Sequence, residues 1–313
     1  MNGTVVEHLP VLLDEVLKFL RVRKGGVYVD GTLGLGGHSE QVLSHLEGTG
    51  QLIALDWDGE ALKEASGRLG GRHENLQILQ ESFKNLPQVL TGLQVQALDG
   101  CLLDLGVSSL QLDSPRRGFS FRREGPLDMR MDDRGETTAA DLIDQLSEEA
   151  LVDLFRRYGE EKAARRIAAA LVERRRLTPI RTTTALARIV EEVKGSGRGR
   201  IHPATQVFQA LRIEVNSELA DLEEVLQVVI SLLKPGGRLV VISFHSLEDR
   251  IVKNVFRKAA GRCVCFRSQE LCDCPRRTEV KMLTRKPVNP TSREIQNNPR
   301  ARSAKLRAVE KEG

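Results

Sequence analysis

A strand that ends in an acid and runs into a glycine-rich turn constrains this chain most. The apolar run Val27–Val29 ends at Asp30, four glycines fall within the next seven residues, and a helix-like pattern starts near His38. Glycines at such a turn let the backbone approach a ligand at the N-terminus of the following helix. The turn therefore predicts a binding site for a nucleotide-like ligand, although a tight turn without a ligand would use the same residues.

Short apolar runs alternate with helix-like segments over the first 110 residues and again near the end of the chain. This rhythm predicts right-handed βαβ units and a parallel sheet that is covered on both faces. The further expected strands are Leu52–Leu55, Leu76–Leu79, Ala97–Leu105, Arg238–Ser243, Val280–Thr284 and Ala304–Val309, and the expected helices of this part are His38–Leu46, Gly59–Leu69 and Ser217–Leu233.

The alternation breaks off in the middle of the chain. The stretch Gln111 to Asp133 is rich in Gly, Pro, Arg and Asp and has no periodicity, which is typical of a functional or irregular loop. Four segments with helical spacing follow, at Ala139–Gln145, Glu148–Tyr158, Glu161–Arg175 and Thr183–Val193. We expect an α/β domain made of residues 1–111 and 206–313, interrupted by an all-helical insertion of residues 112–205.

The charges are distributed unevenly. The net charge is only +4, but residues 155–200 carry 13 Lys and Arg against 5 Asp and Glu, and residues 250–313 carry 17 against 6. Lys and Arg that approach phosphates release counterions, so two basic regions on an acidic body favour a polyanionic partner such as RNA. Solvated helix faces are the alternative. No apolar run is long enough for a membrane span, and the first ten residues do not resemble a secretory signal.

Two further carboxylates follow predicted strands. Asp56 lies twenty residues after Gly36, where Rossmann-like folds place an acid that accepts hydrogen bonds from ribose hydroxyls, although it could also cap the next helix. Asp104 closes another strand and could accept from a cofactor amine or a target amine. Asp30 at the mouth of the turn would repel a pyrophosphate and favour a ligand with an ammonium and a sulfonium. These acids favour an adenosine-containing cationic cofactor.

Other clusters allow two interpretations each. The segment Gly118 to Phe121, which holds Phe119 between flanking arginines, could stack RNA bases or bury its own rings as an anchor. His245 follows a strand and could contact substrate or be a structural histidine. Four of the five cysteines, Cys263, Cys265, Cys272 and Cys274, could bind zinc, but structural zinc usually has two residues within each pair, so free thiols in a reducing cytoplasm are favoured.

Long segments of the chain resemble the bacterial ribosomal RNA small-subunit methyltransferase H family, which methylates cytosine N4 in 16S rRNA. The resemblance spans nearly the whole sequence. It rests on residues 8–13, 30–39, 104–109, 118–121, 125–132, 202–205, 209–218, 243–250 and 298–307.

The resemblance implies a Rossmann-like class I methyltransferase sheet with an inserted all-helical domain that helps to hold the RNA. It implies that S-adenosylmethionine is the cofactor and that it contacts Gly36, Gly37, His38, Asp56, Phe83, Asp104 and Gln111. Candidate substrate contacts are Phe119, Phe121, Arg130, Arg212 and His245.

These features predict an enzyme that methylates 16S rRNA in the small ribosomal subunit, in the cytoplasm, without a membrane or an obligate protein partner. Asp104 is the candidate catalytic residue, because an acceptor for the departing amine proton would assist the reaction. A dinucleotide oxidoreductase would need a third glycine where the chain has Ser39. A non-catalytic RNA-binding ribosome assembly factor is the alternative from another class, but it would need no cofactor site.

Overall fold

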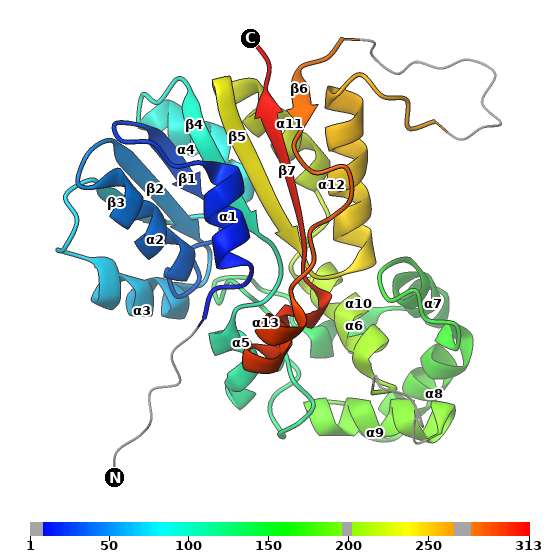
Figure 1. Ribbon diagram of the computed structural model, residues 1–313. Coiled ribbons are helices and arrows are strands. Elements are labelled where there is room, and N and C mark those ends of the chain that lie inside the picture. Colours follow the sequence, from blue (N-terminus) through cyan, green and yellow to red (C-terminus); the bar gives the residue numbers. More distant parts are fainter. Residues whose placement is uncertain (1–8, 196–201, 266–276) are drawn as a thin grey trace. The chain divides into compact units, whose positions relative to one another are not determined.

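The computed structural model describes residues 9–195, 202–265 and 277–313 (Figure 1). The chain forms two compact units. One, the sheet unit, comprises Met1–Gly106 and Leu219–Gly313, and the other, the helical unit, is Val107–Glu218. None of the helices in the described residues is long and apolar enough to cross a membrane.

The sheet unit is built on seven strands in the order β3-β2-β1-β4-β5-β7-β6. The first five run parallel, whereas β7 is antiparallel to both β5 and β6. The strands are β1 (Val27–Asp30), β2 (Gln51–Asp56), β3 (Leu76–Gln80), β4 (Leu98–Asp104), β5 (Leu233–Ser243), β6 (Val280–Met282) and β7 (Lys305–Lys311). The parallel strands all end at one edge, which we call the carboxyl edge, and open α/β sheets bind ligands there.

Helices cover both faces of this sheet because consecutive strand residues point to opposite sides. Leu102 and Val240 belong to the core under α1 and α2, and Leu103 and Val241 to the core under α4, α11 and α12 (Figure 1). The helices of the sheet unit are α1 (Leu13–Leu20), α2 (Gly37–Leu46), α3 (Gly59–Leu69), η1 (Phe83–Asn85), α4 (Leu86–Gly92), α11 (Leu222–Leu232), α12 (Ser246–Ala259), α13 (Ser292–Asn297) and η3 (Pro299–Ser303).

The helical unit has no strands among its described residues. Its helices are α5 (Ser109–Asp113), η2 (Pro115–Arg117), α6 (Ala139–Gln145), α7 (Glu148–Arg157), α8 (Ala164–Leu177), α9 (Thr183–Lys194) and α10 (Thr205–Val215). Side-chain caps explain where several begin, because Thr138, Ser147 and Thr182 each accept a hydrogen bond from the backbone N–H three residues later. Leu151, Ile167, Leu186 and Leu211 are among the residues buried in it.

The expected fold class, an α/β sheet with an all-helical insertion, is confirmed. The helical unit extends further than residues 112–205, because α10 packs against α6 and α7 of that unit. The helix expected from Ser217 begins only at Leu222, since Ser217 and Asp221 have φ angles of 48° and 64°, which a helix does not accept. The strand expected from Arg238 begins at Leu233, with a register shift between Leu98 and Gly100 of its partner strand.

Candidate functional site

We call the turn between β1 and α2 the glycine loop (Asp30–Gly37). Its conformation is stabilised by hydrogen bonds to the carboxylate of Asp30. Asp30 is buried, and its carboxylate accepts from Ser39 Oγ at 2.7 Å and from the Thr32 N–H at 3.1 Å. Burial raises the pKa of Asp30, while the bond from Ser39 lowers it. The carboxylate is thus engaged inside the turn rather than open at its mouth, and it acts mainly on the shape of the loop.

Two glycines of this loop lie so close to neighbouring side chains that a Cβ atom would clash with them. A Cβ on Gly31 would lie 2.5 Å from Leu103 Cδ2 of β4. Gly36, at the start of α2, has a φ of 75°, and a Cβ there would lie 2.7 Å from Leu69 Cδ1 of α3. The loop is therefore packed between β4 and α3 so closely that these two positions require glycine.

Asp56 lies at the end of β2 and faces the glycine loop. Its carboxylate accepts from the Gly34 N–H at 2.7 Å and from the Asp58 N–H at 3.0 Å. Burial raises the pKa of Asp56 to about 6, and these two donors offset part of that effect. The cap of α3 is Asp58, which accepts from the Glu60 N–H. Asp56 is therefore free of the capping role, and a carboxylate can accept about four hydrogen bonds.

The buried side chain of His38 lies beside the half-buried side chain of Asp104, and both have buried polar atoms without hydrogen bonds among the described residues. His38 Nε2 of α2 lies 3.6 Å from Asp104 Oδ2 at the end of β4, which is too long for a hydrogen bond. Both ring nitrogens of His38 and Asp104 Oδ1 are buried, and none of them has a hydrogen-bond partner among the described residues. Buried polar atoms without partners are costly, so they mark a place where a polar ligand completes the site.

Asp104 is also tied to the glycine loop through the backbone. The Asp104 N–H donates to Thr32 Oγ1 at 2.6 Å, and the Gly31 N–H donates to the Leu102 carbonyl at 2.9 Å. The end of β4 and the glycine loop are therefore joined by two hydrogen bonds. This places the His38–Asp104 pair, Asp56 and the glycine loop together at the carboxyl edge of the sheet, as the sequence predicted.

The aromatic side of the site differs in detail from the expectation. Phe83 is buried in the core under α4 and α11, with 8% of its surface exposed. Trp57 directly follows Asp56 and is only partly buried, and its ring centroid lies 6.4 Å from that of Phe83. The Nζ atom of Lys84 lies 5.9 Å from the Trp57 ring centroid. Sequence reasoning missed Trp57, although the only tryptophan of the chain directly after a ribose-binding candidate is a usable signal.

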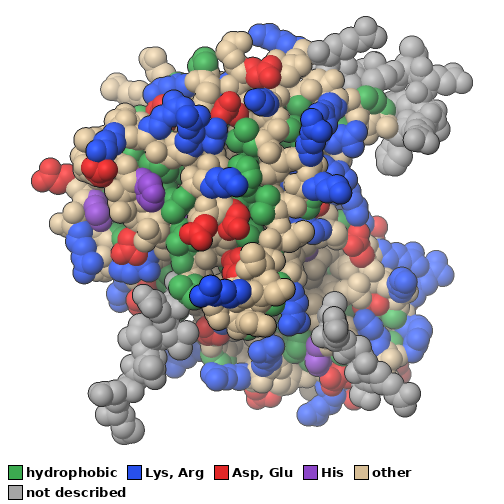
Figure 2. Space-filling view, viewed as in Figure 1, with side chains coloured by type: hydrophobic (Ala, Val, Ile, Leu, Met, Phe, Trp, Pro, Cys, Tyr) green, Lys and Arg blue, Asp and Glu red, His purple; other side chains and the backbone are tan. Residues whose placement is uncertain are grey.

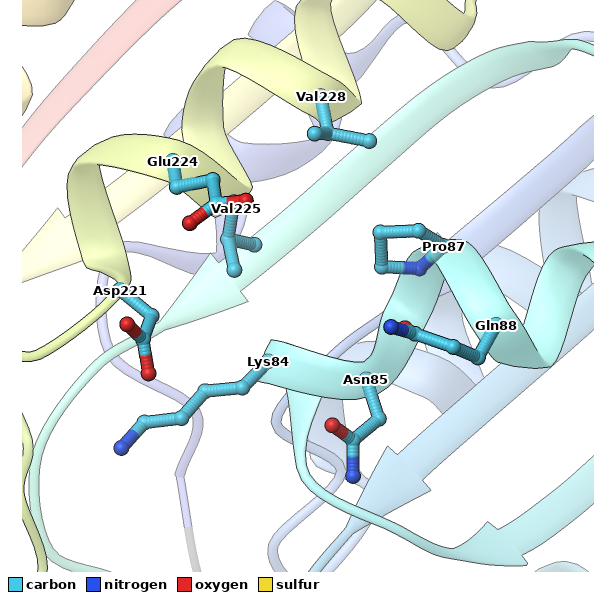
Figure 3. Close-up of a pocket in the computed structure, with 8 residues that line it drawn as sticks. All are labelled: Lys84, Asn85, Pro87, Gln88, Asp221, Glu224, Val225 and Val228. Carbon is cyan, nitrogen blue, oxygen red and sulfur yellow. The ribbon is translucent and has the colours of Figure 1, made fainter.

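A separate hollow opens between η1, α4 and α11 of the sheet unit. Its volume is about 230 Å³, and Figure 3 shows Lys84 and Asn85 from one side and Asp221 and Glu224 from the other. The lining carries charges of both signs and contains none of the predicted cofactor contacts. One of its lining residues, Lys84, directly follows Phe83 in the chain.

Gln111, Phe119 and Phe121 belong to the helical unit. Gln111 completes a capping box of α5, since its Oε1 accepts from the Ser108 N–H at 2.9 Å, and its contact with a cofactor stays a prediction. Phe119 is buried. Phe121 stacks on His202 with ring centroids 4.2 Å apart and meets Phe208 edge-on at 5.0 Å. This packing favours the interpretation of these phenylalanines as anchors of the loop.

The other substrate candidates are each engaged with a neighbouring carboxylate. Arg130 and Arg212 form two-pronged ion pairs with Asp128 and Glu218, with N–O distances of 2.7 Å. His245 is the N-cap of α12, and its Nε2 lies 2.9 Å from Glu248 Oε1. The contact of these three residues with substrate stays a prediction.

The proposed zinc cluster lies partly outside the described residues. Cys263 and Cys265 lie within the described residues, and the Cys265 N–H donates to Cys263 Sγ at 3.4 Å. Cys272 and Cys274 fall in the part of the chain that the structure does not describe. The fifth cysteine, Cys101, is buried in β4, and burial raises its pKa far above the usual range of a thiol.

Comparison with known proteins matches residues 5–312 to the model of the MraW methylase family. A protein of Syntrophobacter fumaroxidans named ribosomal RNA small subunit methyltransferase H is 50% identical over 99% of this chain and 98% of its own length. A protein of the same name from Pelobacter propionicus is 52% identical over 97% of this chain and 98% of its own. A solved SAM-dependent O-methyltransferase from Thermotoga maritima aligns with 99% of this chain and 69% of its own, with 10% identity and a TM-score of 0.42.

Proposed function

This chain belongs to the MraW methylase family, and from that premise we propose that it methylates the exocyclic N4 amine of a cytidine in the 16S rRNA of the small ribosomal subunit. S-adenosylmethionine is the cofactor, and it supplies an electrophilic methyl group on a sulfonium. The names of the relatives support the ribosomal RNA as substrate. The choice of the N4 amine rests on the resemblance and on the acceptor at the end of β4.

The observation that carries this proposal is that the ring nitrogens of His38 and Oδ1 of Asp104 are buried without a hydrogen bond among the described residues. The lone pair of a cytosine amine is delocalised into the ring, so the amine is a weak nucleophile. Holding its nitrogen in line with the methyl group supplies much of the acceleration. Asp104 Oδ1 is an acceptor that can hold one N–H of this amine and turn the nitrogen toward the donor, and it can assist the departure of the proton.

The cofactor would be held by the residues around this pair. Gly36 caps α2 and Gly37 begins it, and the positive end of the helix dipole there suits a carboxylate. Asp56 keeps acceptor capacity for ribose hydroxyls, and Trp57 offers a partly exposed ring to the adenine. The unpartnered nitrogens of His38 would meet polar atoms of the cofactor or of the substrate.

We assign RNA recognition to the helical unit because many of its exposed cations have no acidic partner. Arg157, Arg174 and Arg181 are paired with carboxylates. Four exposed arginines have no such partner among the described residues: Arg156, Arg165, Arg176 and Arg188. Unpaired arginines are suited to forked contacts with phosphates. Because its substrate would be ribosomal, we expect the protein to act in the cytoplasm.

The competing function, a non-catalytic RNA-binding assembly factor, gives no reason for buried acceptors at the carboxyl edge. The deciding experiment transfers a labelled methyl group to small ribosomal subunits that lack the modification and maps the labelled nucleotide. We expect one labelled cytidine, with the label on N4. Binding of subunits without any transfer would favour the assembly factor, and a label on another atom or base would refute the N4 assignment.

A further inference from the structure

The C-terminal part of the sheet unit contains a second basic surface that the proposed RNA role of the helical unit does not use. Between Arg285 and Arg302, in the segment that leads from β6 to β7, the chain carries five Lys and Arg and one acid, Glu294. Four of these cations are exposed and have no acidic partner among the described residues. They are Arg285, Lys286, Arg293 and Arg302, and we call them the α13 surface.

Several other cations of the sheet unit are paired with carboxylates, whereas no ion pair is seen for the four residues of the α13 surface among the described residues. Lys305 and Arg307, the next basic residues of the chain, both contact Asp249. Lys234 pairs with Asp99 at 2.7 Å, and Lys258 with Glu223 at 2.8 Å. The one acid of this segment, Glu294, binds the Leu12 N–H at 2.7 Å, and its single charge leaves the segment with a net positive charge.

The backbone under the α13 surface is fixed. Val288 and Leu306 exchange two backbone hydrogen bonds of 2.9 Å, and the side chain of Thr291 caps α13. Ala301 and Ala304 are buried in the core under α1 and α2. Cations on such a frame lose less freedom on binding than cations on a loose tail, and this reduces the entropic penalty of a contact.

The segment also lies against the start of the cofactor site. Asn298 Nδ2 donates to the Leu9 carbonyl at 3.1 Å, and Glu294 binds the N–H of Leu12. Between these two points, Pro10 packs on Gly37, where a Cβ would lie 2.6 Å from Pro10 Cγ. Gly37 begins α2 and is followed by His38. Residues 9–12 therefore lie between α13 and the start of α2. Figure 2 shows Lys and Arg side chains around the place that α13 has in Figure 1.

We propose that the α13 surface binds the phosphate backbone of the substrate RNA beside the nucleotide that enters the cofactor site. The proposal rests on the RNA methylation proposed above and adds a contact from the sheet unit itself. Its chemistry is that of phosphodiester groups, which favour Lys and Arg without internal partners. It makes no base-specific contact, and its contribution to affinity falls as salt is added.

The test compares two variants that lose the same charge. In the first, Arg285→Gln, Lys286→Gln, Arg293→Gln and Arg302→Gln remove the α13 surface. In the control, Arg21→Gln, Arg23→Gln, Lys24→Gln and Lys281→Gln remove four exposed cations near the opposite ends of the strands. Affinity for unmodified small ribosomal subunits is measured between 50 and 200 mM salt, and cofactor affinity is measured separately by calorimetry.

Each lost phosphate contact lowers the slope of log affinity against log salt by about 0.7 to 0.9. We expect the slope of the α13 variant to fall by about 3, so that the parent loses about 60-fold more affinity over this salt range than the variant does. The control should keep the slope of the parent, and both variants should keep its cofactor affinity.

Equal slopes for the α13 variant and the control would overturn the proposal. So would a loss of affinity for subunits with unchanged affinity for protein-free 16S rRNA, because the surface would then contact a ribosomal protein. If the parent neither binds nor methylates subunits, the proposed function fails, whatever the variants do. If the parent is active and the α13 variant behaves like the control, only the contact proposed for this surface fails.

Discussion

Three aspartates at the ends of neighbouring parallel strands have different roles because their partners differ. Asp30 uses its carboxylate inside the glycine loop, on Ser39 and Thr32. Asp56 binds two backbone N–H groups and keeps capacity for more. Asp104 keeps one oxygen that is buried and has no partner among the described residues. The number of carboxylate lone pairs left for a ligand therefore increases from Asp30 to Asp104. We expect the effect of an aspartate-to-asparagine substitution on catalysis to increase in the same order.

The change Asp104→Asn should lower kcat by about 100-fold at saturating cofactor and subunits, because a neutral amide is a much poorer proton acceptor than a carboxylate. Single-turnover methyl transfer measures this. The matched control is Asp99→Asn in the same strand, where the carboxylate binds Lys234 and the Val27 N–H far from the carboxyl edge. Near-normal turnover of Asp104→Asn with intact cofactor binding would rule out the proposed role.

Cofactor affinity should depend on the ionisation of Asp56. Its pKa of about 6 means that the free protein takes up a proton as the pH falls through 6, and the protonated carboxyl is a weaker acceptor for ribose hydroxyls. Affinity should therefore be constant above about pH 7 and fall up to tenfold per pH unit below 6. Calorimetric titration from pH 5 to 8 checks this, and the step should be missing in Asp56→Asn. An identical pH profile for that variant would contradict the assignment.

Trp57 should report cofactor binding directly, since it is the only tryptophan of the chain and is partly exposed beside Asp56. We expect its emission to change on addition of S-adenosylhomocysteine. Base–aromatic stacking is worth about 1 to 3 kcal/mol, so Trp57→Ala should weaken affinity by roughly 5- to 150-fold, whereas Trp57→Phe should keep most of it. Unchanged emission at a ligand concentration that saturates the protein by calorimetry would place the adenine elsewhere.

At the scale of elements, the glycine loop is held by its neighbours rather than by its own flexibility. The backbone of the loop bonds to β4 and β2, because the Gly31 N–H donates to Leu102 and the Leu33 N–H to Leu55. Helix α3 packs Leu69 against Gly36 from the outside. Three elements that are distant in sequence, β2, β4 and α3, thus define the shape of the eight-residue glycine loop.

The change Gly36→Ala tests this packing. An alanine at a φ of 75° is strained, and its Cβ would lie 2.7 Å from Leu69 Cδ1, so we expect the free energy of unfolding to fall by about 2 to 4 kcal/mol. Gly48→Ala is the control, because Gly48 has a φ of 73° but nothing within 4 Å of its Cβ. Chemical denaturation should show a loss of only about 1 kcal/mol for it. Equal losses would show that the packing against α3 contributes nothing.

At the scale of the whole molecule, the two basic regions of the sequence fall on different units. The first lies on α7, α8 and α9 of the helical unit, and the second includes the α13 surface of the sheet unit. If both surfaces bind the substrate RNA, each unit contributes phosphate contacts to the same complex. Affinity and positioning would then depend on cations in both units, whereas the chemistry would depend on the carboxyl edge alone.

Removing the unpaired arginines of the helical unit should therefore weaken substrate binding without affecting the cofactor. We expect the combined change of Arg156, Arg165, Arg176 and Arg188 to glutamine to raise KM for subunits and to lower the salt slope by up to about 3. Combined with the α13 variant, the two losses should add, because the sites contact different phosphates. A combined variant no weaker than either one alone would show that the two surfaces do not bind the same RNA together.

The sequence by itself determined the fold class and the candidate cofactor residues. Hydrophobic periodicity revealed the parallel strands and most helices, since burial of one face leaves a regular pattern. Asp56 and Asp104 could be found because they directly follow strands, and parallel strands end at one edge of a sheet. The segments that it placed poorly, such as the start of α11 at Leu222 and of β5 at Leu233, depend on single φ angles and on a register shift, which leave no periodic signal.

Only the tertiary structure decided which polar atoms are used and which remain available. The sequence assigns equal carboxylates to Asp30, Asp56 and Asp104, and their differences arise from the partners that folding brings to each. It likewise cannot distinguish Lys305, whose Nζ lies 3.7 Å from an Asp249 oxygen, from Arg302, for which no ion pair is seen among the described residues. Hydrogen bonds and ion pairs between residues distant in the chain depend on positions in space, and no local pattern records them.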